Sequence, residues 1–375
     1  MSTEQSVQAP RQAQDSAADP VAESVERAAQ RIGPVAEPAS VEATPVNLLT
    51  ERTTLPIARA INEGLRAAMA ADERVILMGE DIGPLGGVFR VTDRLQADFG
   101  SARVLDTPLA EAGIIGSAIG LAMNGYRPVC EIQFDGFIFP GFNQIVTQLA
   151  KITSRHDGKV PMPVVIRVPY GGHIGAVEHH QESPEAYFAH TPGLRVVAPS
   201  TANDAYWMIQ QAIQSPDPVL FFEPKAKYWQ KGEVDPAAAS APLHATRIAR
   251  TGSDVTVVGY GAMVTTLLQA AEIAGGEGTS LEVVDLRSVS PIDYEPLLAS
   301  VRKTGRLVVA QEAQGGASVG SEIAAHVAEE AFYSLQAPVL RVSGYDVPFP
   351  PAKLEGVYLP DADRVLEAVD RTMHY

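Results

Sequence analysis

Two kinds of apolar pattern alternate along the chain from about residue 53 onwards. Longer segments carry apolar residues three to four positions apart, the spacing of an amphipathic helix. Ile57, Ile61, Leu65 and Met69 form one such face. Short runs in which all or most residues are apolar predict strands that are buried on both faces. These runs occupy residues 75–78, 164–168, 194–197, 255–258, 281–284, 307–309 and 339–342. The alternation predicts an α/β fold of doubly wound domains, each with a parallel sheet.

Threonine followed by proline marks two predicted helix starts. Thr53 or Thr54 can cap a helix that continues through Pro56. Thr107 can cap a second helix, with Pro108 in its first turn. The second helix carries three glycines, at Gly113, Gly116 and Gly120. Each costs about 1 kcal/mol relative to alanine in a helix, so we expect another surface to approach this backbone closely.

Two segments break the pattern and divide the chain. Residues 1–48 are rich in Ala, Gln, Glu, Ser and Pro and contain no aromatic residue. Such a segment buries too little apolar surface to offset its ordering entropy, which predicts a disordered tail. Residues 236–245 have the Pro- and Ala-rich composition of a linker. We therefore predict one α/β domain at 49–235 and a second at 246–375.

Composition and charge narrow the function classes. A length of 375 residues suits two domains, and the formal net charge of −16 argues against nucleic acid as a partner. Because no run of 18 apolar residues occurs, no membrane span is expected. The first residues lack the basic and apolar stretches of a signal peptide, and they are too acidic for a mitochondrial transit peptide. These features favour a cytoplasmic enzyme of bacterial type.

Few side chains carry recognisable chemistry. Glu111 is a carboxylate in the first turn of the Gly-rich helix, a position that suits either a dipole-stabilised helix-start acid or a functional acid. A Gly-rich loop after residue 168 delivers His173, His179 and His180, but none lies at the spacing of a zinc motif. We therefore expect no metal site there. The single cysteine, Cys130, stands in an apolar run and is predicted to lie in the core.

One motif suggests a different class of enzyme, an α/β hydrolase. Gly316-Ala317-Ser318-Val319-Gly320 matches the Gly-x-Ser-x-Gly elbow of α/β hydrolases. The elbow needs its serine directly at a strand end, whereas residues 311–315 separate Ser318 from the preceding strand. Little chain follows to supply an acid and a base. A Gly-rich turn into a helix is the better interpretation, and no dinucleotide-binding or Walker-type loop follows any predicted strand.

Taken together, several motifs resemble the β chain of thiamine-diphosphate-dependent 2-oxoacid dehydrogenases. The resemblance covers roughly residues 50–375 and leaves out the tail. In chain order the matching segments are 79–81 (Gly-Glu-Asp), 86–90 (Gly-Gly-Val-Phe-Arg), 106–111 (Asp-Thr-Pro-Leu-Ala-Glu), 131–137 (Glu-Ile-Gln-Phe-Asp-Gly-Phe), 178–185 (Glu-His-His-Gln-Glu-Ser-Pro-Glu), 221–225 (Phe-Phe-Glu-Pro-Lys), 285–287 (Asp-Leu-Arg) and 338–342 (Pro-Val-Leu-Arg-Val).

The resemblance implies a transketolase-like pyrimidine-binding domain followed by a transketolase C-terminal domain, and it assigns roles. Glu111 matches the glutamate that hydrogen-bonds the aminopyrimidine ring and promotes its imino tautomer, so that the cofactor's own amine can deprotonate the thiazolium carbon. Phe137 matches an aromatic residue that packs on that ring; many relatives have tyrosine there, which puts any role for a hydroxyl in doubt. His180 matches a histidine that faces the substrate and the reductive-acylation step. Further pyrimidine-pocket positions match Glu80, Leu109 and Gln133.

The missing part of the pattern implies a partner. Thiamine enzymes hold magnesium and the diphosphate through a Gly-Asp-Gly motif, which this sequence does not contain. The resemblance therefore implies that an α subunit supplies that half of the site in an α2β2 heterotetramer. It also implies a monovalent cation such as potassium, bound through backbone oxygens, and docking of the C-terminal domain on the lipoyl acyltransferase core.

The expected reaction is oxidative decarboxylation of a 2-oxoacid and reductive acylation of lipoyl groups. Residues 131–137 and the His179-His180 pair look closer to branched-chain-type chains, so we predict a branched-chain 2-oxoacid as substrate. A pyruvate dehydrogenase β subunit is the alternative. A non-catalytic scaffold chain is the second alternative, and it would be favoured by loss of Glu111 or His180, both of which are present.

Overall fold

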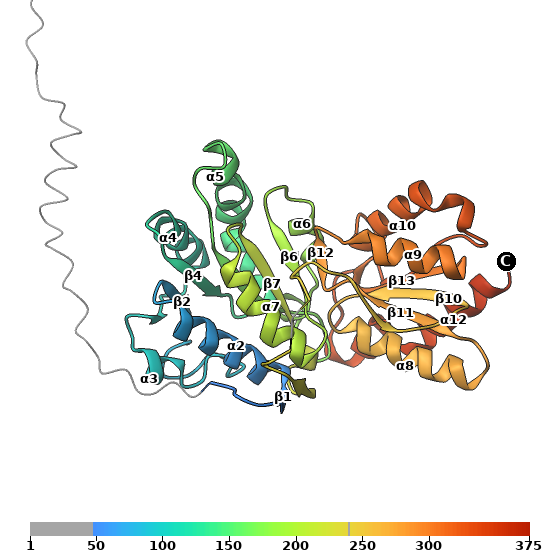
Figure 1. Cartoon of the computed structure of the whole chain (residues 1–375), viewed down its shortest axis with the longest axis horizontal. Helices are drawn as coiled ribbons and strands as arrows, with labels where there is room; N and C mark the ends of the chain where they lie inside the picture. The colour runs from blue at the N-terminus through green and yellow to red at the C-terminus, as the bar shows by residue number, and fades with distance from the viewer. Residues whose placement is uncertain (1–47, 239–240) are drawn as a thin grey trace, which may run out of the picture. The chain divides into compact units, whose positions relative to one another are not determined.

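The computed structural model describes residues 48–238 and 241–375, which contain two large sheets and one small one (Figure 1). The larger sheet has the spatial order β12-β6-β7-β5-β4-β2-β3. Its strands are β2 (Val75–Gly79), β3 (Val104–Asp106), β4 (Arg127–Glu131), β5 (Val165–Tyr170), β6 (Arg195–Val197), β7 (Val219–Pro224) and β12 (Ser288–Ser290). The second sheet has the order β14-β13-β10-β11-β9. Its strands are β9 (Arg247–Arg250), β10 (Val255–Gly259), β11 (Leu281–Asp285), β13 (Leu307–Gln314) and β14 (Leu340–Gly344).

Every predicted strand is a strand, and the predicted α/β class is confirmed. The parallel arrangement is confirmed for the interior of both sheets. It is wrong at two edges, where β12 pairs antiparallel with β6 and β9 pairs antiparallel with β11. Both edge strands are short and contain as many polar residues as apolar ones or more, so they lack the predominantly apolar run of a buried strand.

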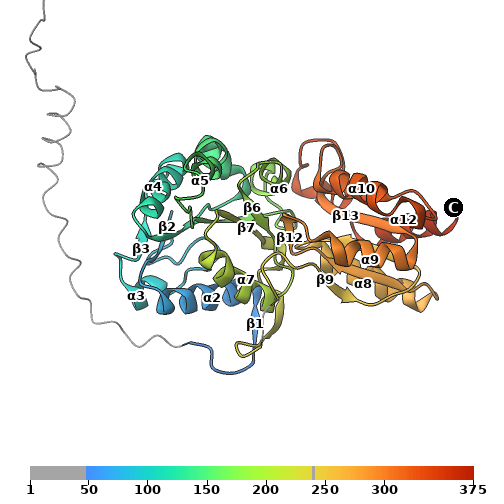
Figure 2. The same cartoon turned by 45° about the horizontal axis from the view of Figure 1, so that its top comes forward.

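Helices cover both faces of each large sheet (Figure 2). In the larger sheet, α2 (Ile57–Ala71) and α7 (Ala202–Gln214) pack on one face, while α4 (Glu111–Met123) and α5 (Ala150–Arg155) pack on the other. In the second sheet, α8 (Met263–Gly276) and α12 (Ala362–Met373) oppose α9 (Tyr294–Thr304) and α10 (Val319–Glu330). Shorter helices are α3 (Leu95–Phe99), α6 (Glu185–Ala189) and α11 (Glu355–Tyr358).

Side chains alternate across the larger sheet as its pleat requires. On β4, Val129 joins the core under α2, whereas Cys130 joins the core under α4. Cys130 is fully buried, as predicted, and burial raises the pKa of its thiol to about 12. The core on the α4 side continues to the side of the second sheet covered by α9 and α10, so the two sheets share apolar packing.

The predicted start of the first helix is wrong. Residues 53–56 form β1 (Thr53–Pro56), which pairs antiparallel with β8 (Lys231–Val234), and α2 begins only at Ile57. Neither threonine caps the helix, because distant pairing holds this segment extended up to Pro56. The predicted apolar face is confirmed, since all four of its residues are buried.

The helix α4 confirms the glycine-bearing helix but not the expected close approach to it. A Cβ added at Gly116 or Gly120 would meet no atom within 4 Å, and one at Gly113 would meet only the Ala110 Cβ at 3.6 Å. All three glycines are exposed. Nothing in the described part of this chain therefore uses the surface that the glycines leave open.

The predicted boundaries fall partly outside the described residues. Residues 1–47 of the predicted tail belong to the part that is not described. The segments 235–238 and 241–246, between β8 and β9, contain no helix or strand, and the linker at 236–245 stays a prediction. Among the described residues, no helix combines the length and apolar character that a membrane span requires.

A buried carboxyl joins the two halves. The Tyr260 hydroxyl after β10 donates a 2.5 Å hydrogen bond to Oε1 of Glu185 on α6, and both residues are buried. Burial raises the pKa of Glu185 to about 7, although the Tyr260 hydrogen bond counteracts it. The folded chain therefore holds a proton here that an unfolded chain releases near the ordinary value of 4.5.

We expect this proton to make stability fall as the pH rises from about 4.5 to about 7 and to level off above that. Over this window Glu185 costs about 3 kcal/mol of unfolding free energy, since each pKa unit is worth about 1.4 kcal/mol. Glu185→Gln should remove the loss, so urea midpoints of the variant and the parent should diverge towards about pH 8. Glu329→Gln, an exposed change on α10, is the matched control. Parallel pH profiles for Glu185→Gln and the parent would contradict the assignment.

Candidate active site

The carboxyl edge of the larger sheet gathers the predicted site residues. Strands β5, β4, β2 and β3 are adjacent and parallel, so their carboxyl ends meet at one edge. Glu80 follows β2, Gln133 follows β4, and the loop to His180 follows β5. The segment after β3 leads into α4 and Glu111. This is where open α/β sheets place their binding residues.

Glu111 is the first residue of α4, and its side chain is buried. The predicted capping by Thr107 is wrong. The N–H of Thr107 donates to the carbonyl of Gly79 at 2.9 Å, which prolongs the β2–β3 pairing, and Ala110 is the residue that precedes the helix. Among the described residues, the Glu111 carboxylate makes no side-chain hydrogen bond. It is thus free to accept or donate a hydrogen bond to a ligand.

Glu80 provides a second buried carboxyl next to Glu111. Burial raises the pKa of Glu80, and the negative charges of Glu111 and Asp81 raise it further. Its Oε1 is buried without a hydrogen-bond partner in the described residues. A buried acceptor without a partner is costly, so this pair of acids is unusual as pure structure and typical of a site that a ligand completes.

Gln133 is held beside these acids. Its amide nitrogen donates to Oδ2 of Asp81 at 3.2 Å and lies 3.4 Å from the carbonyl of Glu80. Leu109, unlike the buried Glu80 and Glu111, is exposed, with 76% of its surface accessible to solvent. An exposed leucine in the segment before Glu111 presents apolar surface that the described chain leaves uncovered.

An aromatic cluster fixes the His180 ring. His180 ends a short 3-10 helix, Glu178–His180, and stacks on Phe134 with 4.0 Å between ring centroids and 11° between planes. Phe137 meets the same imidazole edge to face at 5.1 Å. Nδ1 of His180 is buried without a hydrogen-bond partner in the described part of the chain. The structure thus brings Phe137 and His180 together, whereas His179 is exposed.

The close packing of this cluster depends on a glycine. A Cβ at Gly136 would lie 2.4 Å from the carbonyl oxygen of His179. Any other residue at this position would push the Glu178–His180 helix away from the end of β4.

The second half of the chain anchors the histidine loop. Oε2 of Glu312, on β13, accepts a hydrogen bond from the N–H of Gly172 at 3.1 Å. The Glu355 carboxylate of α11 accepts from the N–H groups of Gly175, at 3.1 Å, and His173. Two carboxylates from the second half therefore hold the backbone just before His180.

Sequence reasoning missed a buried ion pair under the site. Nζ of Lys225 lies 2.5 Å from Oδ1 of Asp135, and both side chains are fully buried. Oδ2 of Asp135 also accepts from the N–H of Glu182, at 2.7 Å. The signal was present, because Asp135 and Lys225 lie in two motifs quoted for the resemblance, but only the fold shows that they meet.

The described residues give no support to the two alternative chemistries, metal binding by the histidines and nucleophilic catalysis by Ser318. Within residues 48–238 and 241–375, no three His, Cys, Asp or Glu side chains are grouped to hold a metal ion. Ser318 caps α10, and its hydroxyl accepts from the N–H of Ser321. Ser318 therefore stands at a turn into a helix, as the sequence predicted.

Comparison with known proteins agrees with this architecture. Residues 53–230 match the pyrimidine-binding domain of transketolase, and residues 244–365 match the transketolase C-terminal domain. A pyruvate dehydrogenase E1 component subunit beta from Leifsonia xyli is 70% identical over 322 residues, which cover 86% of this chain and 96% of that protein. The chain belongs to the E1 β-subunit family of 2-oxoacid dehydrogenases.

Other relatives of this E1 β chain carry different substrate names. A 3-methyl-2-oxobutanoate dehydrogenase subunit beta from Mycobacterium tuberculosis is 49% identical, covering 90% of this chain and 97% of that protein. Among solved structures, a split-gene transketolase described as an inactive beta4 tetramer matches with a TM-score of 0.69 and 24% identity, over 85% of this chain and 98% of that one. The last likeness concerns the fold alone.

Proposed function

We propose that this E1 β chain supplies the pyrimidine-binding half of a thiamine-diphosphate site and acts in the oxidative decarboxylation of pyruvate, with transfer of the acyl group to lipoyl groups. The observation that carries the proposal is the Glu111 carboxylate, which is buried at the carboxyl edge of the sheet and makes no hydrogen bond to any described residue. The kinship with E1 β subunits supports it.

The residues at the sheet edge fit such a cofactor. An aminopyrimidine ring offers donors and acceptors at its edge, and the edge of the sheet offers Glu111, Oε1 of Glu80 and the amide of Gln133. Phe137 and Leu109 offer apolar surface for the faces of the ring. When bound, thiamine diphosphate supplies the nucleophilic carbon that attacks the 2-oxoacid.

We assign each residue a task of its own. Glu111 holds a proton and passes it to and from a ring nitrogen. Glu80 and Gln133 orient the ring. Phe137 packs on the ring without a hydroxyl. His180 faces the substrate and the lipoyl group, with its ring held by Phe134.

An α subunit would complete the site. The sequence lacks a Gly-Asp-Gly motif for magnesium and the diphosphate, so we propose that the α chain holds both. The exposed Leu109 and the open backbone at Gly116 and Gly120 support an interface on this side. We further propose an α2β2 heterotetramer, a potassium ion on backbone oxygens, and docking of the acyltransferase core on the C-terminal domain.

Pyruvate is favoured over the branched-chain substrate that the motifs predicted. The relative at 70% identity is named for pyruvate, whereas the relative at 49% is named for 3-methyl-2-oxobutanoate. A branched-chain 2-oxoacid therefore becomes the second candidate substrate. The scaffold reading has less support, because Glu111 and His180 are both present and placed at one edge.

The deciding experiment measures 2-oxoacid-dependent reduction of an artificial electron acceptor, with thiamine diphosphate and magnesium present. The chain is assayed alone and with the α subunit from the same genome, on pyruvate and on 3-methyl-2-oxobutanoate. We expect turnover only with both chains, and faster turnover of pyruvate. Turnover by this chain alone would refute the half-site, and no turnover in any pairing would favour the scaffold.

The Phe134–His180 stack gives a further prediction. Phe134→Leu should free the imidazole from its stacked position and slow lipoyl-dependent acyl transfer by about tenfold to a hundredfold. Reduction of the artificial acceptor, which bypasses the lipoyl step, should stay near the parent rate. Phe139→Leu is the matched control, because Phe139 lies in the same segment but contacts Tyr187 instead. Equal losses in both assays would show that Phe134 serves stability or cofactor binding.

A further inference from the structure

The loop between β5 and His180 has a backbone shape that binds negative charge. The angle φ is positive at Gly171 (84°), His173 (70°) and Gly175 (67°), whereas residues 172 and 174 lie outside this left-handed region. Successive N–H groups of a backbone that alternates in this way point into one concavity, which attracts an anion. His173 adopts the left-handed conformation without being glycine, a strain that persists only where the surroundings enforce it.

Carboxylates of the C-terminal half bind the N–H groups of this loop. Oε2 of Glu355 accepts from the N–H of Gly175 at 3.1 Å, and Oε1 accepts from the N–H of the strained His173. Both oxygens of Glu355 are thus used, one for each N–H group. Glu312 binds the N–H of Gly172 through a single oxygen, Oε2, at 3.1 Å.

The other N–H groups of the loop connect it to the residues that follow His180. The N–H of Gly171 donates to the carbonyl of Glu182 at 3.0 Å, and the N–H of Ile174 donates to Oε1 of Gln181 at 3.2 Å. All five consecutive N–H groups, from residue 171 to residue 175, therefore have an acceptor. The loop couples the carboxylates of the C-terminal half directly to the chain on which His180 stands.

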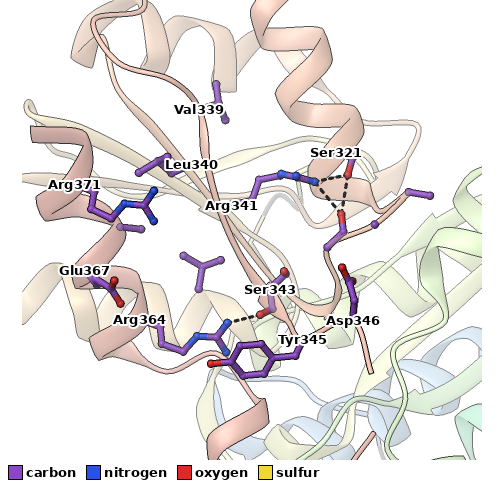
Figure 3. Close-up of a pocket in the computed structure, with 15 residues that line it drawn as sticks. Ser321, Val339, Leu340, Arg341, Ser343, Tyr345, Asp346, Arg364, Glu367 and Arg371 are labelled. Atoms are coloured by element: carbon purple, nitrogen blue, oxygen red, sulfur yellow. Dashed lines mark hydrogen bonds between the residues drawn. The ribbon is translucent and has the colours of Figure 1, made fainter. Parts of the chain in front are cut away.

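The helix that carries Glu355 is itself held in place. Glu355 begins α11, and the carbonyl of Tyr358 on the same helix accepts from Nη1 of Arg364 at 3.1 Å. Figure 3 shows Arg364 reaching from α12 to Ser343, whose carbonyl it also binds. The Arg364 guanidinium lies over the Tyr345 ring, 4.6 Å from its centroid. The Glu355 carboxylate is therefore presented to the loop by packed and hydrogen-bonded structure.

We propose that Glu355 is a positioning residue for the reductive acylation of the lipoyl group. Its carboxylate fixes the shape of the loop at 171–175, and the loop in turn places the His180 imidazole. The inference rests on the proposed function and extends it, because it makes the C-terminal domain a part of the active-site geometry. Glu355 acts through the loop and not on the reacting atoms, so the decarboxylation that depends on Glu111 does not require it.

The test compares two variants of the full chain, each assembled with the α subunit from the same genome. Glu355→Gln keeps the length of the side chain but offers one acceptor oxygen instead of two. We expect lipoyl-dependent acyl transfer to slow about tenfold, while reduction of the artificial acceptor stays near the parent rate. Glu355→Asp keeps both acceptor oxygens and should recover part of the lost rate. A packing role predicts the reverse order, since glutamine keeps the volume and aspartate does not.

Hydrogen exchange reads the same contact without any turnover. In the full chain without its partner, the amides of residues 171–175 should exchange faster in Glu355→Gln than in the parent. Glu329→Gln, an exposed change on α10, is the control of equal charge for both measurements. Unchanged exchange in Glu355→Gln would overturn the inference at the level of the loop.

The activity measurements separate this inference from the proposed function. Parental acyl transfer in Glu355→Gln, or faster transfer in Glu355→Gln than in Glu355→Asp, overturns the inference and leaves the proposed function standing. Equal losses in both assays also overturn it, by assigning Glu355 to stability or cofactor binding. A parent complex that turns over no 2-oxoacid overturns the proposed function, and the inference with it.

Discussion

Glu111→Gln is expected to reduce 2-oxoacid decarboxylation by about 10²- to 10⁴-fold, the usual contribution of a positioned acid or base. Glutamine keeps the size and hydrogen-bonding shape of the side chain but cannot exchange a proton. Because the carboxylate makes no hydrogen bond within the described chain, the substitution breaks no internal hydrogen bond. The measurement is turnover of the variant with the α subunit, together with gel filtration to show that the two chains still assemble.

The control separates catalysis from the helix-start role that the sequence also allowed. Glu322 is an exposed acid in the first turn of α10, the position that Glu111 has in α4. If both acids serve only the helix dipole, both changes cost a few tenths of a kcal/mol in stability and leave turnover intact. Parental turnover in Glu111→Gln would remove this residue from the mechanism.

The sequence predicted those parts of the fold that depend on local pattern. Predominantly apolar runs such as 164–168 form strands, because both of their faces are buried. The start of α2 was mispredicted because β8, about 180 residues later in the chain, holds Thr53–Pro56 extended. The antiparallel edges at β9 and β12 were missed for the same reason, since pairing rather than composition defines them.

For the site, too, local motifs were predicted from the sequence and long-range contacts were not. Motif resemblance named Glu80, Glu111, Gln133, Phe137 and His180, and the strand order explains why all of them lie at one sheet edge. The supports of His180 were not foreseen. Glu312 and Glu355 hold its loop from more than a hundred residues away, and no local pattern marks an acid as an anchor for distant backbone.

Among the contacts between residues far apart in the sequence, those of Arg167 are expected to contribute most to stability. Its side chain is buried on β5 between two buried carboxylates. Nη1 donates to Glu131 Oε2 at 2.6 Å, and Nε and Nη2 donate to both oxygens of Glu223 at 2.7 and 3.0 Å. Burial raises the pKa of Glu131, and the Arg167 charge opposes that rise. Arg167→Met would leave two buried acids without their cation.

We expect Arg167→Met to lower the unfolding free energy by about 3–5 kcal/mol, the cost of removing one partner from a buried ion pair. The urea midpoint of the full chain measures it. Arg74→Met, which breaks an exposed pair with Asp72, should leave the urea midpoint nearly unchanged, because exposed ion pairs contribute little to stability.

The source of the loss can be separated into charge and packing. Adding Glu131→Gln and Glu223→Gln to Arg167→Met removes the stranded charges while keeping similar volumes, so the triple variant should recover part of the lost stability. A triple variant no more stable than Arg167→Met would show that shape, not charge, makes Arg167 necessary.

The same ion-pair network lies close to the candidate site. Glu131 ends β4 two residues before Gln133, so its bond to Arg167 also holds the end of the strand that positions Gln133. A triple variant that folds but binds thiamine diphosphate weakly would show that this buried charge serves the geometry of the site more than stability.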